Sequence, residues 1–168
     1  SMEDGRVCAF NITMNVTFPS LGLPFGVSNL QVEKSEERYA VAWIYEQVGA
    51  SYSNPKVSRV SIVPLQSETA PVLTLQLEFQ IDQVLLTREC VLIAEKIDYP
   101  ANVQNVHVHN ATNFEKLTTF NVPSSSLVEL DVSEDSLIVR YSDDYVRTYN
   151  LETFEMEGKQ FYHTSQFE

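Results

Sequence analysis

The stretch YSDDYVRTYNLETFE, from Tyr141 to Glu155, decides the fold of this chain. The apolar run LIVRY leads into it, a polar Asp-Asp turn follows, and a second run, YVRTYNL, ends at a Glu-Thr turn. Runs of β-branched and aromatic residues between polar turns are typical of β-hairpins. If the same unit recurs, the chain is a repeat protein made of strands.

The hydrophobic pattern has period two along most of the chain, which is the strand signal. In VELDV, Val128, Leu130 and Val132 share one face, and LTLQLEF (73–79) alternates in the same way. The best helix candidate is SEERYAVAWIYEQ (35–47), but its aromatic and β-branched centre favours a buried strand. We therefore predict an all-β chain.

The predicted strands group in fours. Three units cover residues 27–80, 81–124 and 125–168, after an N-terminal remnant of two strands, RVCAFNIT and MNVTF, in residues 1–26. Between the first and second strands of these units lie EKSEER, TREC and SED. NATNFE (110–115) and NLETFE (150–155) each join a third strand to a fourth and contain a Thr and a Phe-Glu pair. This correspondence indicates a repeat.

The last unit resembles a blade of a WD40-type β-propeller. The family's pattern of Ser, Asp, a short turn, Val-Arg, an aromatic residue, Asp and Leu is matched here by Ser142, Asp143, Asp144, Val146, Arg147, Tyr149, Asn150 and Leu151. Two departures stand out: the family's Trp-Asp pair is Tyr149-Asn150, and its Gly-His pair is missing. The resemblance implies consecutive four-stranded antiparallel blades of a partial WD40-like β-propeller.

A chain of this length holds about three and a half such blades, whereas propellers close with typically about 4–8. The end blades of an open fragment need partners, because each blade normally covers its neighbours. We therefore expect either a homodimer or a heteromeric partner that completes the propeller. Both readings make the chain a non-catalytic scaffold for protein–protein interaction.

The charge balance argues against nucleic acid as a partner. The formal net charge is −12, and affinity for a phosphate backbone comes largely from Lys and Arg. The acidic residues concentrate after Ser125, which suits a docking face for a protein with a basic surface. No apolar run is long enough for a membrane-spanning helix, and the N-terminus lacks the pattern of a signal peptide. We expect no membrane association and an intracellular protein, cytoplasmic or nuclear.

The resemblance also implies a docking face. In WD40 proteins, ligands commonly bind at the turns between second and third strands and at the links between blades. Those segments are GASYSNPK (49–56), EKIDYPAN (95–102), NVPSSS (121–126) and SDDY (142–145). Exposed tyrosines beside carboxylates suit protein binding, although such rings can also pack locally. The predicted partner-binding residues are Tyr52, Asp98, Tyr99, Asp143, Asp144 and Tyr145.

No catalytic, cofactor or metal motif stands out, so we expect no enzyme activity, no cofactor and no metal. Asp143 and Asp144 are adjacent turn residues that point in different directions, and His107 and His109 share a face of one strand without a third ligand. Cys8 and Cys90 are too few for a disulfide framework. Three glycosylation sequons, NIT, NVT and NAT, leave an alternative open: a secreted or cell-surface β-sandwich or adhesion module.

Overall fold

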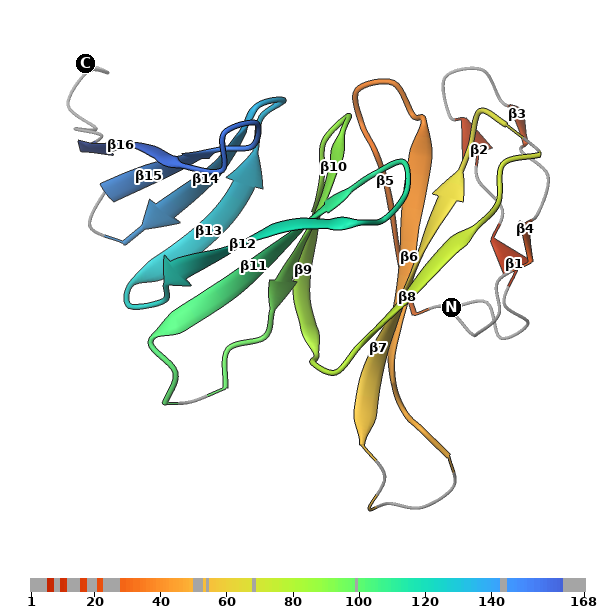
Figure 1. Cartoon of the computed structure of the whole chain (residues 1–168), viewed down its shortest axis with the longest axis horizontal. Coiled ribbons are helices and arrows are strands. Elements are labelled where there is room, and N and C mark those ends of the chain that lie inside the picture. Colours follow the sequence, from red (N-terminus) through yellow and green to blue (C-terminus); the bar gives the residue numbers. More distant parts are fainter. Residues whose placement is uncertain are drawn as a thin grey trace. The chain divides into compact units, whose positions relative to one another are not determined.

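The computed structural model describes residues 6–7, 10–11, 16–17, 21–22, 28–49, 53, 55–67, 69–98, 100–142 and 145–161. Before residue 28 and after residue 158 this description covers the backbone alone. All regular structure in these residues is β-strand, which confirms the all-β prediction (Figure 1). The described residues contain no helix that could span a bilayer.

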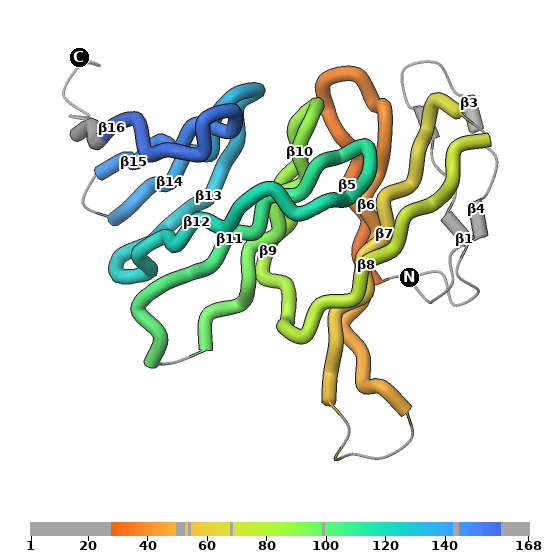
Figure 2. The backbone as a smooth tube through the Cα atoms, viewed as in Figure 1, coloured from red at the N-terminus to blue at the C-terminus, as the bar shows by residue number. Residues whose placement is uncertain are grey.

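Twelve of the strands form three consecutive four-stranded antiparallel sheets, each paired in the order of the chain. The first sheet is β5 (Asn29–Val32), β6 (Tyr39–Gln47), β7 (Lys56–Pro64) and β8 (Leu73–Leu77). The second is β9 (Ile81–Leu86), β10 (Cys90–Glu95), β11 (Val103–Asn110) and β12 (Lys116–Pro123). The third is β13 (Leu127–Val132), β14 (Ser136–Tyr141), β15 (Tyr145–Asn150) and β16 (Met156–Phe161). Figure 2 follows the backbone up and down through each sheet.

The N-terminal segment differs from its prediction. Where the sequence suggests two strands, the described residues of this segment form four short ones, β1 (Arg6–Val7), β2 (Phe10–Asn11), β3 (Val16–Thr17) and β4 (Leu21–Gly22). β1 pairs with β4 and β2 with β3, both antiparallel. The final sheet is complete without the N-terminal segment, because its fourth strand, β16, pairs along β15.

The turn between the first and second strands is built alike in all three sheets. In each, the residue after the first strand donates its backbone N–H to the carbonyl of the residue that opens the second strand. The three bonds are Glu33 to Tyr39 (3.0 Å), Thr87 to Cys90 (2.9 Å) and Ser133 to Ser136 (2.9 Å). The predicted equivalence of EKSEER, TREC and SED is therefore confirmed.

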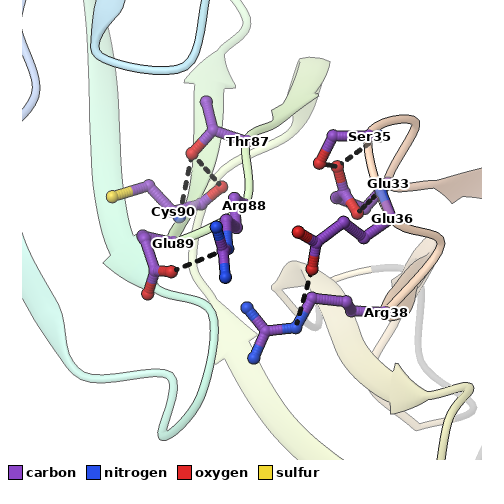
Figure 3. Close-up of polar contacts among 8 residues, drawn as sticks. All are labelled: Glu33, Ser35, Glu36, Arg38, Thr87, Arg88, Glu89 and Cys90. Carbon is purple, nitrogen blue, oxygen red and sulfur yellow. Dashed lines mark hydrogen bonds and ion pairs between the residues drawn. The ribbon is translucent and has the colours of Figure 1, made fainter.

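Side chains reinforce two of these turns, as Figure 3 shows. The buried Glu33 carboxylate accepts hydrogen bonds from the Ser35 hydroxyl, from the Ser35 N–H at 2.6 Å and from the Glu36 N–H at 3.1 Å. Burial alone would raise the pKa of Glu33, but these bonds outweigh it and hold the pKa below its ordinary value. In the second sheet the Thr87 hydroxyl accepts the Cys90 N–H at 3.0 Å.

The turns between third and fourth strands in the second and third sheets also match. Phe114 and Phe154 both have positive φ, at 62° and 59°, a conformation that side-chain-bearing residues seldom adopt. In both hairpins the pairing shifts by one residue at the same place, before His109 and before Tyr149. NATNFE and NLETFE therefore form one kind of turn, as the sequence predicts.

The chain divides into two compact units. The first is residues 1–81 with 111–115, and the second is residues 82–110 with 116–168. The core of the first lies on β6 and β7, where buried side chains run along both strands. The core of the second draws on both of its sheets, as the contact of Phe120 with Tyr149 shows, their ring centroids 4.9 Å apart. Each unit thus has a hydrophobic core of its own.

Candidate functional site

A groove of about 200 Å³ lies in the second unit, at the end of the sheets where strands β9, β11 and β13 begin. Two of the four predicted docking segments contribute to it, 95–102 through Ile97 and 121–126 through Ser124. Its walls come from both sheets of the unit. The lining residues are Asp82, Gln83, Ile97, Gln104, Ser124, Leu127, Val128, Glu129 and Leu130.

Gln104 fixes one side of the groove from within the protein. Its side chain is 2% exposed, and its Nε2 donates to Asp82 Oδ2 and to the Glu95 carbonyl, both at 3.0 Å. A buried amide with both donors satisfied holds one rotamer, because any other would leave polar atoms unpaired. The Asp82 carboxylate, on an exposed residue, is thereby held in a defined position.

The other side is held by bonds to backbone carbonyls. Gln83 Nε2 donates to the Leu130 carbonyl at 3.2 Å, which ties β9 to β13 across the two sheets. At the link, the Ser124 N–H donates to the Asn102 carbonyl at 2.9 Å and the Leu127 N–H donates to the Ser124 carbonyl at 3.2 Å. The groove is therefore a preformed feature whose borders are tied to ordered backbone.

The chemistry of the lining is acidic and partly apolar. Asp82 and Glu129 contribute carboxylates, and no Lys, Arg or His is among the lining residues. Arg140 lies 3.7 Å from Glu129, but both side chains are more than half exposed, so this ion pair is weak. Val128 is 65% exposed and offers an uncovered apolar surface.

Two of the predicted docking residues lie among the described ones. Asp98 is exposed in the turn 96–102, next to Ile97 of the groove lining, and its carbonyl accepts the Ala101 N–H at 2.8 Å. Tyr145 opens β15 with a half-buried ring that packs against the core of the second unit. The other four, Tyr52, Tyr99, Asp143 and Asp144, lie outside the described residues. A docking role for all six stays a prediction.

Tyr145 belongs to an aromatic cluster around Arg147. The Arg147 guanidinium carbon lies 5.6 Å from the ring centroids of both Tyr141 and Tyr145, and these two rings are 5.9 Å apart. Burial alone would lower the pKa of Arg147, but the neighbouring Tyr149, Tyr141 and Tyr145 outweigh it, so the pKa stays above its ordinary value. The cluster is a cation held by tyrosine rings.

His107 stands in a polar network on the second sheet. Its Nδ1 lies 3.1 Å from Thr119 Oγ1 and its Nε2 lies 3.4 Å from Glu95 Oε2, which also accepts from Asn105 Nδ2 at 3.0 Å. Burial, with a smaller contribution from Lys116, lowers the pKa of His107, although Glu95 opposes this. The imidazole is therefore neutral near pH 7 and acts as a link between strands β10, β11 and β12.

The remaining titratable candidates show no site. Cys90 is a buried thiol whose pKa is raised by burial, which keeps it protonated and unreactive. Within the described part of the chain, no three His, Cys, Asp or Glu side chains gather in a way that could hold a metal ion. Cys8 lies outside the described residues.

Comparison with known proteins shows a fold and no family. No family model matches the sequence, and no curated protein matches it. Among solved structures, the chain is similar to the crystal structure of HIRA(644-1017), with a TM-score of 0.50 and 10% sequence identity. The match covers 73% of this chain and 35% of that one, so the chain spans about a third of the length of the structure it resembles. At this identity the likeness shows the fold alone.

Proposed function

We propose that this chain is a non-catalytic protein-interaction module, built as a partial WD40-like propeller, that binds a protein partner at the groove of its second unit. The observation that carries the proposal is the position of the groove. It lies at the second-to-third-strand turn and the link between sheets, the two kinds of segment at which the resemblance places ligands. The repeated four-stranded sheets support the propeller reading over a secreted β-sandwich.

The polar network around His107 is better read as structural than as catalytic. Glu95, His107 and Thr119 follow the order of an acid–imidazole–hydroxyl relay. The His107 side chain is only 12% exposed, however, and Thr119 sits directly opposite it in the β11–β12 ladder. None of the three lines the groove. We therefore propose no enzyme activity and no cofactor for this chain.

A random peptide library displayed on phage tests the docking proposal with purified chain. Peptides selected on the wild-type chain are expected to lose binding to the variant Val128→Asp, because Val128 is the most exposed apolar side chain of the lining. Val128 is a surface residue, so the variant should fold, which a thermal melt checks. The matched control is Leu117→Asp, another exposed apolar strand residue that is not part of the lining. Selected peptides that bind the wild type and Val128→Asp equally would overturn the proposal.

We further propose that the chain assembles, as a homodimer or with a partner subunit, inside the cell. The support is the repeat itself, since the end sheets of an open array lack a neighbour on one side. Light scattering on the purified chain over a wide concentration range tests the homodimer, whose mass should be twice that of one chain. A monomeric mass throughout would refute it.

A further inference from the structure

The groove described above is too small for most organic ligands and large enough for one side chain. Ligand pockets for drug-sized molecules measure about 300–1,000 Å³, and this groove measures about 200 Å³. At roughly 30 Å³ for each water molecule it holds about six or seven waters, which is close to the size of one long side chain. Its occupant is therefore a single residue of a partner.

The hydrogen-bonding groups of the lining select the kind of residue. Both N–H groups of Gln104 Nε2 are already used, by Asp82 and by the Glu95 carbonyl, and one N–H of Gln83 Nε2 serves the Leu130 carbonyl. Among the polar side chains of the lining, acceptors predominate, namely the carboxylates of Asp82 and Glu129 and the amide oxygens of the two glutamines. A site of acceptors needs a donor, and carboxylates favour one with a positive charge.

The apolar part of the groove lining favours a partner side chain with a long apolar stem. Ile97, Leu127 and Val128 contribute apolar surface to the lining of the groove. Lys and Arg side chains bury their methylene stems along such surfaces while the charged head reaches polar groups. The two carboxylates supply negative charge. The weak ion pair of Glu129 with Arg140 can be replaced by a stronger one with the side chain of the partner.

We propose that the groove takes the side chain of an arginine from a protein partner, with the guanidinium between Asp82 and Glu129 and the stem along Val128. Arginine fits better than lysine because its planar head carries five donors and can reach a carboxylate and an amide oxygen at once. This inference rests on the proposed function and names the chemistry that the partner presents.

The test uses the full chain labelled with ¹⁵N and the capped tripeptide acetyl-Gly-Arg-Gly-amide as probe. Titration is expected to shift the side-chain amide signals of Gln83 and Gln104 and the backbone signal of Val128. Citrulline in place of arginine keeps the shape but removes the charge, and it should bind at least about tenfold more weakly, since a charge-assisted bond contributes about 1.5–3 kcal/mol. Equal shifts from the citrulline peptide would overturn the proposal. Tighter binding of the same tripeptide with lysine in place of arginine would also overturn it.

Matched variants separate the groove from general charge attraction. Asp82→Asn and Glu129→Gln should each weaken binding of the arginine peptide severalfold. Glu134→Gln and Asp135→Asn remove the same charges from the turn at the other end of β13 and should leave binding unchanged. Equal losses in all four variants would show nonspecific attraction and overturn the proposal.

The two proposals fail separately. Library peptides that need Val128 but contain no arginine would keep the docking function and overturn this inference. Specific binding of the arginine tripeptide at Asp82 and Glu129, with no groove-dependent peptide from the library, would support this inference and count against the docking function.

Discussion

The second and third sheets share a backbone plan but fill one position in different ways. Cys90 pairs with Asn110 as Ser136 pairs with Asn150, so the two ladders align residue by residue. In this alignment His107 corresponds to Arg147, and its neighbours Glu95 and Asn105 correspond to Tyr141 and Tyr145. A neutral ring joined to polar groups and a cation stacked on aromatic rings thus occupy the same place. The two sheets therefore share this backbone position but differ in the chemistry of the side chain that fills it.

The faces of the two sheets that lie opposite to His107 and Arg147 differ more, in how deeply their side chains are buried. In the second sheet Leu92, Val106 and Val108 are fully buried in the core. Their counterparts in the third sheet are Ile138, Val146 and Thr148, all only partly buried, and the counterpart of buried Ala94 is exposed Arg140. The third sheet therefore presents a mixed polar surface where the second presents core.

The largest expected effect tests this contrast. Leu92→Ala should lower the free energy of unfolding by about 3 kcal/mol, because it leaves a cavity in a packed core. Ile138→Ala should cost less than about 1.5 kcal/mol, since its side chain is already partly in water. Urea denaturation measures both. If Ile138→Ala costs as much as Leu92→Ala, and does so only at high protein concentration, a second copy or another sheet covers this face.

The next largest effect on the free energy of unfolding is expected at the equivalent positions of His107 and Arg147. His107→Ala should cost about 2 kcal/mol, because it removes two hydrogen-bonding contacts from a mostly buried network. Arg147→Ala should cost about 1 kcal/mol, the size of a partly exposed cation–π interaction. Arg88→Ala is a control, since Arg88 is more than half exposed beside Glu89. Equal costs for His107 and Arg147 would show that the stacked cation is worth as much as the polar network.

A pH dependence distinguishes the two groups further. His107 has a lowered pKa in the folded protein, against an ordinary value of 6.5. As the pH falls below about 6.5 the unfolded chain therefore binds a proton before the folded one does, so stability falls until the folded pKa is passed. His107→Gln should remove this loss, an effect smaller than that of truncation. Arg147→Gln should leave the slope unchanged, as urea titrations at pH 5 to 8 would show; a slope unaltered in His107→Gln contradicts the assignment.

The smallest effect concerns Arg140, the exposed counterpart of Ala94. Arg140→Ala should change stability by no more than about 0.5 kcal/mol, because its ion pair with Glu129 is exposed on both sides. The same variant frees Glu129 and should strengthen binding of the arginine tripeptide by about twofold or less. Calorimetric melting and the NMR titration measure the two quantities. A larger loss of stability would mean that the Arg140 stem covers apolar surface.

The sequence predicts the strands and turns well, because these depend on local patterns. YAVAWIYEQ is strand β6, and the two Phe-Glu turns match down to their positive φ. The sequence aligns Asn110 with Asn150 through NATNFE and NLETFE, but the preceding residues, His109 and Tyr149, share no chemical type. The common shift in pairing before each ring shows that His109 and Tyr149 occupy equivalent positions.

The groove could not be predicted in detail. Asp82, Gln104 and Glu129 lie far apart in the sequence and come together only through sheet pairing and the packing of two sheets. None stands in a recognisable motif, and Gln104 gives no signal beyond its place in a strand. The turn and the link beside the groove follow from the order of strands, whereas the side chains that line the groove follow from tertiary packing.

In each of the three four-stranded sheets, strands pair with their neighbours in sequence, and this bears on how the chain folds as it is made. All four strands of a sheet are contiguous, so each ladder closes only a short loop and costs little entropy. During synthesis, which proceeds from the N-terminus, each sheet can form as soon as its fourth strand has left the ribosome. The second sheet must then wait for the third before Leu92 and Val108 are covered, and in that interval the nascent chain exposes these apolar side chains to solvent.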